Sequence, residues 1–164
     1  MSDSPKPTIR KATPDDAPAL GRLGALLVAV HHGFDADRFI APGPGTERGY
    51  GGFLVSQIGR EEAVLLVAEE DGAVVGYVYA GLEGPDWMAL RGSAGVIYDI
   101  IVDPERRQEG IGGLPLQAIL QALADRGAPR VVLHTATPNL VAQRLFAAVG
   151  FRSTMIEMTR EWPG

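Results

Sequence analysis

The segment over residues 100–116, IIVDPERRQEGIGGLPL, most constrains what this chain can fold into. An apolar run rich in β-branched residues breaks at Asp103 and Pro104, and charged residues then lead through three glycines into a helical pattern. Glycines allow backbone N–H groups to converge on one small concavity, and the first turn of a helix adds unpaired N–H donors and a partial positive charge. The segment therefore predicts a strand, an anion-binding loop and a helix, an arrangement that suits a pyrophosphate group.

Spacing excludes two common loops of this kind. A dinucleotide-binding fingerprint needs Gly or Ala three residues after its second glycine, where this chain has Pro115. A P-loop needs a lysine directly after its last glycine, and none follows here. The pattern that remains is Val102-x-Pro104-x-x-Arg107-x-x-Gly110-x-Gly112.

A second block lies nearer the C-terminal end of the sequence. Residues 130–135, RVVLHT, have the composition of a strand, and Asn139 precedes a short helical pattern that ends at Gly150 and Phe151. Together with the glycine loop, this block resembles the GCN5-related N-acetyltransferase (GNAT) family in order and in spacing. The resemblance extends over most of residues 7–160.

The resemblance implies an α/β fold, with a single-domain mixed β-sheet flanked by helices. In that fold the strands near residues 94–102 and 130–136 are parallel neighbours that splay apart, and the pantetheine arm of coenzyme A enters the gap. Splayed strands have backbone N–H and C=O groups that need partners, which the amide-rich pantetheine arm supplies. The residues that the resemblance assigns to binding acetyl-CoA, the expected cosubstrate, are Ile100, Ile101, Val102, Arg107, Gln108, Glu109, Gly110, Ile111, Gly112, Gly113, Asn139 and Phe146.

Simpler interpretations exist for several of these residues. Arg107 could be a solvated surface arginine, the glycines could be turn residues only, and Asn139 could cap the final helix. Pro115 departs from the family pattern, because it has no N–H group and disfavours helical geometry at Leu114. The helix after the loop is therefore expected to begin near Gly112.

Length, charge and composition limit the remaining possibilities. A chain of 164 residues suits one domain, which we place at residues 7–164 after a flexible tail over residues 1–6. The formal net charge of −5 indicates no extended basic face for nucleic acid, and the absence of cysteine excludes disulfides and a thiolate nucleophile. The three histidines lack the usual metal-ligand spacing, so no metal is expected. Neither a signal peptide nor a membrane span is evident, and the expected location is the cytoplasm.

The rest of the sequence predicts the element order β-α-α-β-β-β-α-β-α-β. Strands are expected over residues 7–12, 64–69, 74–82, 94–102, 131–135 and 153–160, with Asp71 and Gly72 in a hairpin turn. Helices are expected over residues 13–30, after the glycine loop and over residues 142–149. Residues 46–60 have a weaker helical pattern that includes Gly49, Gly51 and Gly52. Each glycine costs up to about 1 kcal/mol inside a helix, so we expect a loose segment there.

Acetyl transfer to an amine requires a neutral nucleophile, an oriented thioester and donors for the developing oxyanion. A backbone N–H near Val102 is the expected oxyanion donor. Asp99 and Glu83 are the candidate acceptors of the amine's proton, although Asp99 could equally hold a loop or pair with an arginine. Members of the resembled family often have tyrosine at the position of Phe146, where its hydroxyl protonates the leaving thiolate. Phenylalanine cannot, so water or another group such as Tyr98 takes that role, or efficient catalysis is lost.

The acceptor site is expected on the side opposite the glycine loop. Residues 31–39, HHGFDADRF, are similar to a segment that borders the acceptor in some members of the family, and His31, His32 and Phe34 are therefore candidate substrate contacts. A histidine pair at a helix end also complements the helix dipole. Trp87 is a candidate either for the wall of the acceptor site or for packing at a hairpin tip.

Three functional classes follow from these observations. The first is an acetyl-CoA-dependent N-acetyltransferase that moves the acetyl group directly, in a ternary complex, to a primary amine of a small molecule, an amino acid or a peptide N-terminus. The second is a noncatalytic acyl-CoA-binding or sensing module, and the third is a nucleotide-binding domain of another fold. Nucleic acid and membrane are not expected as partners, and both a monomer and a homodimer remain open.

Overall fold

The computed structural model describes residues 6–109 and 111–164, except for the side chains of residues 107–109. These residues form five strands and four α-helices in the order β-α-α-β-β-β-α-β-α, with two short 3-10 turns, η1 (Pro14–Asp16) and η2 (Pro104–Glu109). The strands are β1 (Thr8–Lys11), β2 (Ala63–Glu70), β3 (Ala73–Glu83), β4 (Ala94–Val102) and β5 (Val131–Leu133), and the helices are α1 (Ala17–Phe34), α2 (Thr46–Ser56), α3 (Gly113–Asp125) and α4 (Leu140–Ala148).

The strands form one mixed sheet in the order β1-β2-β3-β4-β5. The first four pair antiparallel with their neighbours, whereas β4 and β5 are parallel. The β2–β3 turn has Asp71 at φ 50° and Gly72 at φ 77°. Positive φ at both central residues matches the right-handed twist of a two-residue hairpin, so this predicted turn is confirmed.

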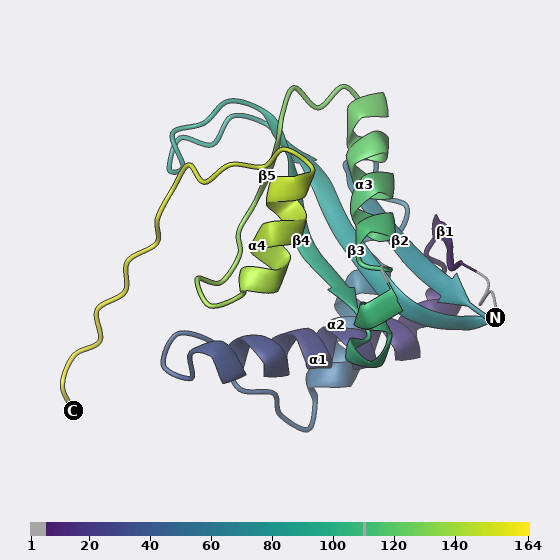
Figure 1. Cartoon of the computed structure of the whole chain (residues 1–164), viewed down its shortest axis with the longest axis horizontal. Helices are drawn as coiled ribbons and strands as arrows, with labels where there is room; N and C mark the ends of the chain where they lie inside the picture. The colour runs from purple at the N-terminus through teal and green to yellow at the C-terminus, as the bar shows by residue number, and fades with distance from the viewer. Residues whose placement is uncertain (1–5, 110) are drawn as a thin grey trace.

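Helices cover both faces of the sheet (Figure 1). Buried residues of α1 and α2, such as Leu20 and Leu54, pack against β2 and β3 side chains such as Tyr77. On the opposite face, Leu116 and Ile119 of α3 pack with Val78 and with Phe146 of α4. The predicted α/β fold, a single-domain mixed sheet flanked by helices, is confirmed.

Glycines bring α1 and α2 into very close contact. A Cβ atom at Gly21 would lie 2.2 Å from the carbonyl oxygen of Glu47, and one at Gly51 would lie 2.5 Å from that of Ala17. The expected loose segment over residues 46–60 is therefore wrong, because Thr46–Ser56 is a regular helix. The packing that Gly51 permits offsets the local cost of its flexibility.

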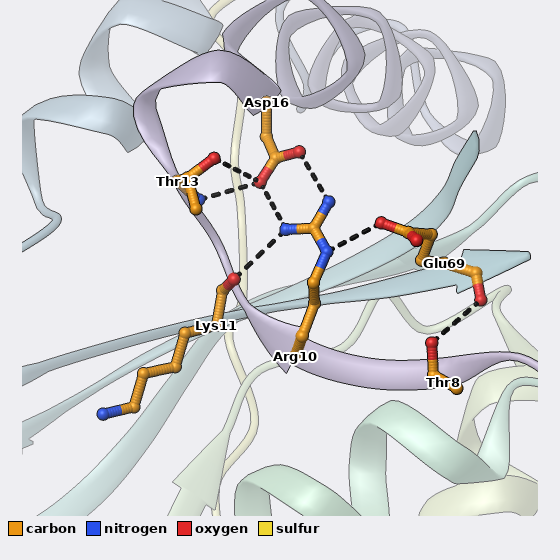
Figure 2. Close-up of polar contacts among 6 residues, drawn as sticks. All are labelled: Thr8, Arg10, Lys11, Thr13, Asp16 and Glu69. Atoms are coloured by element: carbon orange, nitrogen blue, oxygen red, sulfur yellow. Dashed lines mark hydrogen bonds and ion pairs between the residues drawn. The ribbon is translucent and has the colours of Figure 1, made fainter. Parts of the chain in front are cut away.

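Arg10 ties β1 to the start of α1 and to β2 (Figure 2). Its two Nη atoms donate to both carboxylate oxygens of Asp16 at 2.8 and 2.9 Å, and its Nε donates to Glu69 at 2.7 Å. Asp16 is buried and also accepts from the Thr13 backbone N–H at 2.8 Å. Paired guanidinium and carboxylate groups of this geometry are among the strongest hydrogen bonds in proteins.

The expected strand over residues 153–160 is absent. Residues 152–164 form no strand and are exposed. Pairing requires a neighbouring edge, and Glu157 instead forms an ion pair with Arg38, which follows α1. This ion pair holds residues 152–164 beside the loop after α1. The alternating sequence pattern of these residues is not sufficient to form a strand without hydrogen bonds to a neighbouring strand.

Candidate functional site

A cavity of about 660 Å³ opens where β4 and β5 part. The ladder between these strands consists of three pairs, Gly95↔Val131, Val96↔Val132 and Ile97↔Leu133. Beyond it, residues 98–102 of β4 line one wall, and His134 and Thr135, which follow β5, line another. The predicted splaying of these two strands is thus present in the structure.

A β-bulge marks the point where the strands part. Tyr79 of β3 lies opposite Asp99, whereas Ala80 lies opposite Ile97, so Tyr98 is an extra residue in β4. The extra residue places Tyr98 beside Tyr79, with ring centroids 4.9 Å apart, on the same face as Asp99. Bulges re-aim side chains in this way and are common near functional sites.

Asp99 is held by two phenols inside this cavity. The Tyr50 hydroxyl of α2 donates to Asp99 Oδ2 at 2.6 Å, and the Tyr77 hydroxyl of β3 donates to the same oxygen at 3.0 Å. Tyr50 reaches this position because α1 has no side chain at Gly24, where a Cβ atom would lie 2.2 Å from the tyrosine ring. The close contact of α1 with α2 therefore orients the carboxylate.

Burial controls how these groups ionise. It raises the pKa of Asp99 above its ordinary value, and the two phenolic hydrogen bonds and the nearby His31 offset part of that rise. Burial, followed by the charge of Asp99, also raises the pKa of Tyr50 and of Tyr77. Both phenols therefore stay protonated and donate to Asp99 at neutral pH. A carboxylate with a raised pKa, in a cavity, is suited to accept a proton.

His31 lines the same cavity from α1. Its Nδ1 lies 2.8 Å from the Leu27 carbonyl oxygen, which can only accept a hydrogen bond. Nδ1 therefore carries a proton, and in the neutral ring Nε2 is the acceptor. Phe34 and Phe39 contact the ring edge-on, with centroids 5.7 and 5.1 Å away, and fix its orientation.

The beginning of α3 forms another part of the wall. Gly112 caps this helix, Gly113 is its first residue, and both line the cavity, whereas Ile111 is buried and does not line it. Pro115 lies in the first turn, where its missing N–H leaves no intrahelical bond unmade. The helix starts as the sequence predicts, and the first turn of a helix has N–H groups without an intrahelical partner.

Three contacts hold the turn that precedes the glycines. The Asp103 N–H donates to the Val75 carbonyl oxygen at 2.7 Å, and the Asp103 carboxylate pairs with Arg22 at 3.2 Å. Arg106 pairs with Glu70, which is buried at the end of β2. Gly110 and the side chains of Arg107, Gln108 and Glu109, which the family resemblance assigns to acetyl-CoA, lie outside the described residues.

Asn139 and Phe146 line the cavity from α4 and the residue before it. Asn139 also caps this helix, because its side-chain oxygen accepts from the Ala142 N–H at 3.2 Å. Phe146 is 6% exposed and packs edge-on against Phe151 at 5.9 Å. Its ring occupies the wall without a hydroxyl group.

Several predicted residues lie elsewhere. Trp87 is 80% exposed in the loop between β3 and β4, outside the cavity lining. Glu83 is also outside the lining, where it accepts from Arg91 at 2.8 Å and from the Tyr98 hydroxyl at 2.5 Å. The His32 Nδ1 hydrogen-bonds to the Phe39 carbonyl oxygen at 2.9 Å, and His32 does not line the cavity either.

The structure brings in residues that the sequence reasoning missed, namely Tyr50, Tyr77, His134 and Thr135. Tyr77 and Tyr79 are two residues apart and therefore lie on the same side of β3. This spacing predicts a buried face of the strand, but it does not predict a hydrogen bond from Tyr77 to Asp99. Nothing in the local sequence joins Tyr50 to position 99, because that contact depends on how α2 crosses α1.

The described residues form neither a cluster of metal ligands nor a helix that spans a membrane. They contain no group of three or more His, Asp or Glu side chains arranged to hold a metal ion. None of the helices in this part of the chain combines the length and apolar character required to cross a membrane.

Comparison with known sequences gives one family. The Acetyltransferase (GNAT) family model matches residues 34–151. Mycothiol acetyltransferase of Cellulomonas flavigena is 34% identical over 102 residues, which cover 60% of this chain and 29% of that protein. Human N-acetyltransferase 8 is 35% identical over 88 residues, which cover 54% of this chain and 38% of that protein. The matched region thus spans roughly a third of each relative.

Solved structures share the fold over nearly the whole chain. A variant of the BH1408 protein of Bacillus halodurans has a TM-score of 0.77 at 22% identity and covers 95% of this chain and 98% of its own. A predicted acetyltransferase of Clostridium acetobutylicum, solved with acetyl-CoA, has a TM-score of 0.70 at 17% identity. It covers 93% of this chain and 96% of its own.

Proposed function

This chain belongs to the Acetyltransferase (GNAT) family, and on that premise we propose that it transfers an acetyl group from acetyl-CoA directly to a primary amine. The observation that carries the proposal is the position of Asp99, with Tyr50 and Tyr77 on its Oδ2, in the cavity between the parted strands. A half-buried acid of raised pKa has no structural need to face a cavity, but a proton acceptor does.

The residues around the cavity fit acetyl-CoA. At one part of the wall Gly112 and Gly113 open the first turn of α3, whose N–H groups and partial positive charge favour a phosphate. Among the described residues, the nearest neighbour of a Cβ atom at Gly112 would be Leu145 at 3.8 Å, so these residues leave the space in front of this turn open. The parted edges of β4 and β5 are suited to the amide groups of a pantetheine arm.

The acceptor part of the cavity favours an amine with an apolar group beside it. Leu27, Val30, Phe39 and Ile40 line the wall near His31 and Asp99. Asp99 would attract the ammonium form of the amine and then accept its proton. His31, through Nε2, is the second candidate for that proton.

Acetyl-CoA supplies an activated acetyl thioester: the amine nitrogen bonds to the acetyl carbon, the carbon–sulfur bond breaks, and one proton leaves the amine while the thiolate takes another. We assign the first proton to Asp99. Tyr98 is a poor source for the second, because burial and the hydrogen bond to Glu83 raise its pKa above the ordinary phenol value, far above the pKa of about 8.5 of a typical thiol. Water is the proposed donor, since Phe146 has none.

A noncatalytic acyl-CoA-binding module is the second candidate. Phe146 favours it, because the cavity wall carries a ring where many relatives in the resembled family have a proton donor. We rank it lower because a pure binding site gives no reason for a phenol-held carboxylate at Asp99. Cytoplasmic location remains a prediction, which fluorescence microscopy of the tagged chain would test.

Two measurements test the proposal. Titration calorimetry should detect acetyl-CoA binding, and Gly112→Asp should weaken it by at least about tenfold, equivalent to about 1.4 kcal/mol, because a carboxylate would face a phosphate. Gly112→Ala is the matched control and should retain affinity, given the open space at this position. Equal affinity of both variants for acetyl-CoA would place the phosphates elsewhere.

Thiol release with a panel of primary amines should identify the acceptor. Asp99→Asn should then lower kcat by about 10²-fold or more while acetyl-CoA affinity stays within about twofold, because the amide accepts the phenolic hydrogen bonds but not the proton. Binding of acetyl-CoA without thiol release for any amine would favour the noncatalytic module. Phe146→Tyr is the complementary test, and faster turnover would identify thiolate protonation as the limiting step.

A further inference from the structure

One part of the cavity, which we call the acceptor pocket, is lined by Val30, His31, Phe39, Ile40 and Asp99. Its walls are mostly apolar, and within the described residues Asp99 is the one acid that lines the cavity. The same described lining contains no lysine and no arginine. A molecule in the acceptor pocket therefore meets a carboxyl group but no lysine or arginine side chain.

The hydrogen-bond donors around the acceptor pocket already have acceptors. The Tyr50 hydroxyl donates to Asp99 at 2.6 Å, and the Tyr98 hydroxyl donates to Glu83 at 2.5 Å. His31 uses its Nδ1–H for a carbonyl oxygen of its own helix at 2.8 Å, so in the neutral ring Nε2 can only accept. A carboxylate is also an acceptor, and none of these three side chains has a donor left for it.

Two side chains outside this group can carry positive charge, but neither suits a carboxylate in the pocket. Arg38 stacks on the Phe39 ring, with its guanidinium carbon 4.8 Å from the ring centroid, and its Nη2 donates to Glu157 at 3.0 Å. Its charge is paired with that acid, and Arg38 does not line the cavity. His134 lines the cavity after β5 but is exposed to solvent, where water weakens its attraction for an anion.

The turn before the glycines lies toward the other end of α1. Arg22 of α1 pairs with Asp103, the residue before this turn, and His31 follows Arg22 by nine residues of the same helix. Nine residues extend about 13–14 Å along a helix axis. Figure 1 shows the start of α3 above the N-terminal half of α1, whereas α1 ends at the left of the view. Positive charge near the glycines is thus placed for the phosphates of the coenzyme and not for the acceptor.

We propose that the acceptor is a primary amine with an apolar group and without a carboxylate next to its nitrogen, so that free amino acids are excluded. This inference rests on the proposed acetyl transfer and selects among the acceptors that the sequence left open. The apolar group packs against Val30, Phe39 and Ile40, which favours its burial. An α-carboxylate would enter beside Asp99 with neither a cation nor a donor, and unpaired buried charge is a strong basis for rejecting a ligand.

Three compounds that share one skeleton separate charge from size. They are 2-phenylethylamine, phenylalaninamide, which adds a neutral amide beside the amine, and phenylalanine, which has a carboxylate at that place. Thiol release should give a kcat/KM for phenylalanine at least about 100-fold below that for either of the other two, because only phenylalanine buries an unpaired anion. Equal values for phenylalanine and phenylalaninamide would overturn the proposal.

Calorimetry with the same compounds distinguishes this proposal from the acetyl transfer on which it rests. The protein saturated with coenzyme A should bind 2-phenylethylamine and phenylalaninamide, and should bind phenylalanine at least about 100-fold more weakly. This order of binding without any thiol release would support the selectivity of the pocket and contradict acetyl transfer. Acetylation of phenylalanine as fast as its amide would support acetyl transfer and contradict the selectivity. Absence of binding for all three compounds would overturn the proposed pocket.

A single added cation tests where the acceptor lies. Ile40 lines the pocket and is 78% exposed, so Ile40→Lys should fold and place an ammonium group at its rim. The ratio of kcat/KM for phenylalanine to that for phenylalaninamide should rise at least about tenfold, because the new charge attracts the carboxylate. Met88→Lys makes the same charge change at a 90% exposed position outside the cavity lining and should leave the ratio unaltered. The same ratio in both variants would overturn the assignment of the acceptor to this pocket.

Discussion

The buried carboxylate of Glu70, at the end of β2, accepts a hydrogen bond from the guanidinium of Arg106 in the turn before the glycine loop. The two residues are 36 positions apart in the chain. Arg106 is thereby drawn toward the sheet, and the turn that leads to Gly112 is attached to a rigid strand. We interpret Glu70 as a positioning residue for the loop.

Glu70→Gln should raise the KM for acetyl-CoA about tenfold and change kcat less than about twofold, because the weakened contact lets the loop sample other positions. Steady-state kinetics at saturating amine measures both constants. Glu105→Gln, an exposed change in the same turn, is the control and should leave both unaltered. An unchanged KM in a folded Glu70→Gln protein would show that the Glu70–Arg106 contact does not hold the loop in place.

Tyr50→Phe should shift the acidic limb of the activity profile to higher pH. The Tyr50 hydrogen bond lowers the pKa of Asp99 against the larger raising effect of burial. Without it the carboxylate holds its proton to higher pH, and a base must be deprotonated to act. The pH dependence of kcat/KM measures this shift, and Tyr79→Phe, whose hydroxyl contacts Gln57 and not Asp99, is the control. A fall in activity with no shift would assign Tyr50 a purely structural role.

Gly24→Ala should destabilise the protein by about 1–3 kcal/mol, because the new methyl group overlaps the Tyr50 ring and overpacks the contact between α1 and α2. Gly33→Ala, in the same helix, has no neighbour within 4 Å of the new Cβ and should be neutral or stabilising by up to about 1 kcal/mol. Urea denaturation compares the two variants. Equal stabilities would mean that α2 shifts freely on α1, and the activity of Gly24→Ala would then report whether Asp99 shifts too.

Asp16→Asn should cost about 2–3 kcal/mol at pH 7, since it removes a charged acceptor of Arg10 from a buried position. The Arg10 hydrogen bond lowers the pKa of Asp16 below its unfolded value of 3.8. The stabilisation is therefore complete above that value and is lost as the pH falls through the lower pKa of the folded state.

Denaturation of the wild type and Asp16→Asn across pH 2–7 should show curves that converge at the acidic end. Asp15→Asn, which changes an exposed residue of the same turn, should follow the wild type throughout. A gap between wild type and Asp16→Asn that is as wide at pH 2 as at pH 7 would mean that packing, not charge, carries the effect.

Local patterns were sufficient for most elements of this fold. The bounds of β4 match the prediction residue for residue, because an apolar run between Gly92 and Asp103 has little freedom to start or end elsewhere. The hairpin at Asp71 and the start of α3 also depend on neighbours in the sequence. The wrong prediction of a loose segment over residues 46–60 is explained by a non-local contact. The free-energy cost of the glycines in α2 can be read from the local sequence, whereas the Gly21–Gly51 contact that offsets it joins two helices.

The same distinction applies to the candidate site. Gly112 and Phe146 were assigned from motif spacing and Asp99 from its position just before the apolar segment that starts at Ile100, and all three lie in the cavity lining. The phenols on Asp99 come from residues 49 and 22 positions away, and no motif connects them to it. The alternating pattern over residues 153–160 wrongly predicted a strand, because a pattern cannot state whether a neighbouring edge is available to pair with.

The extra residue in β4 means that the opening of the sheet depends on a count of residues and not on any side chain. Ile97 and Ile100 face the α3 side while Tyr98 and Asp99 share the other. Deleting Tyr98 would restore regular alternation, leave Asp99 on its present face and allow the β4–β5 ladder to continue past Ile97. Such a chain should fold into a flatter and more stable sheet whose interior is closed to coenzyme and amine alike. Loss of this one residue should thus abolish the site while it raises the free energy of unfolding.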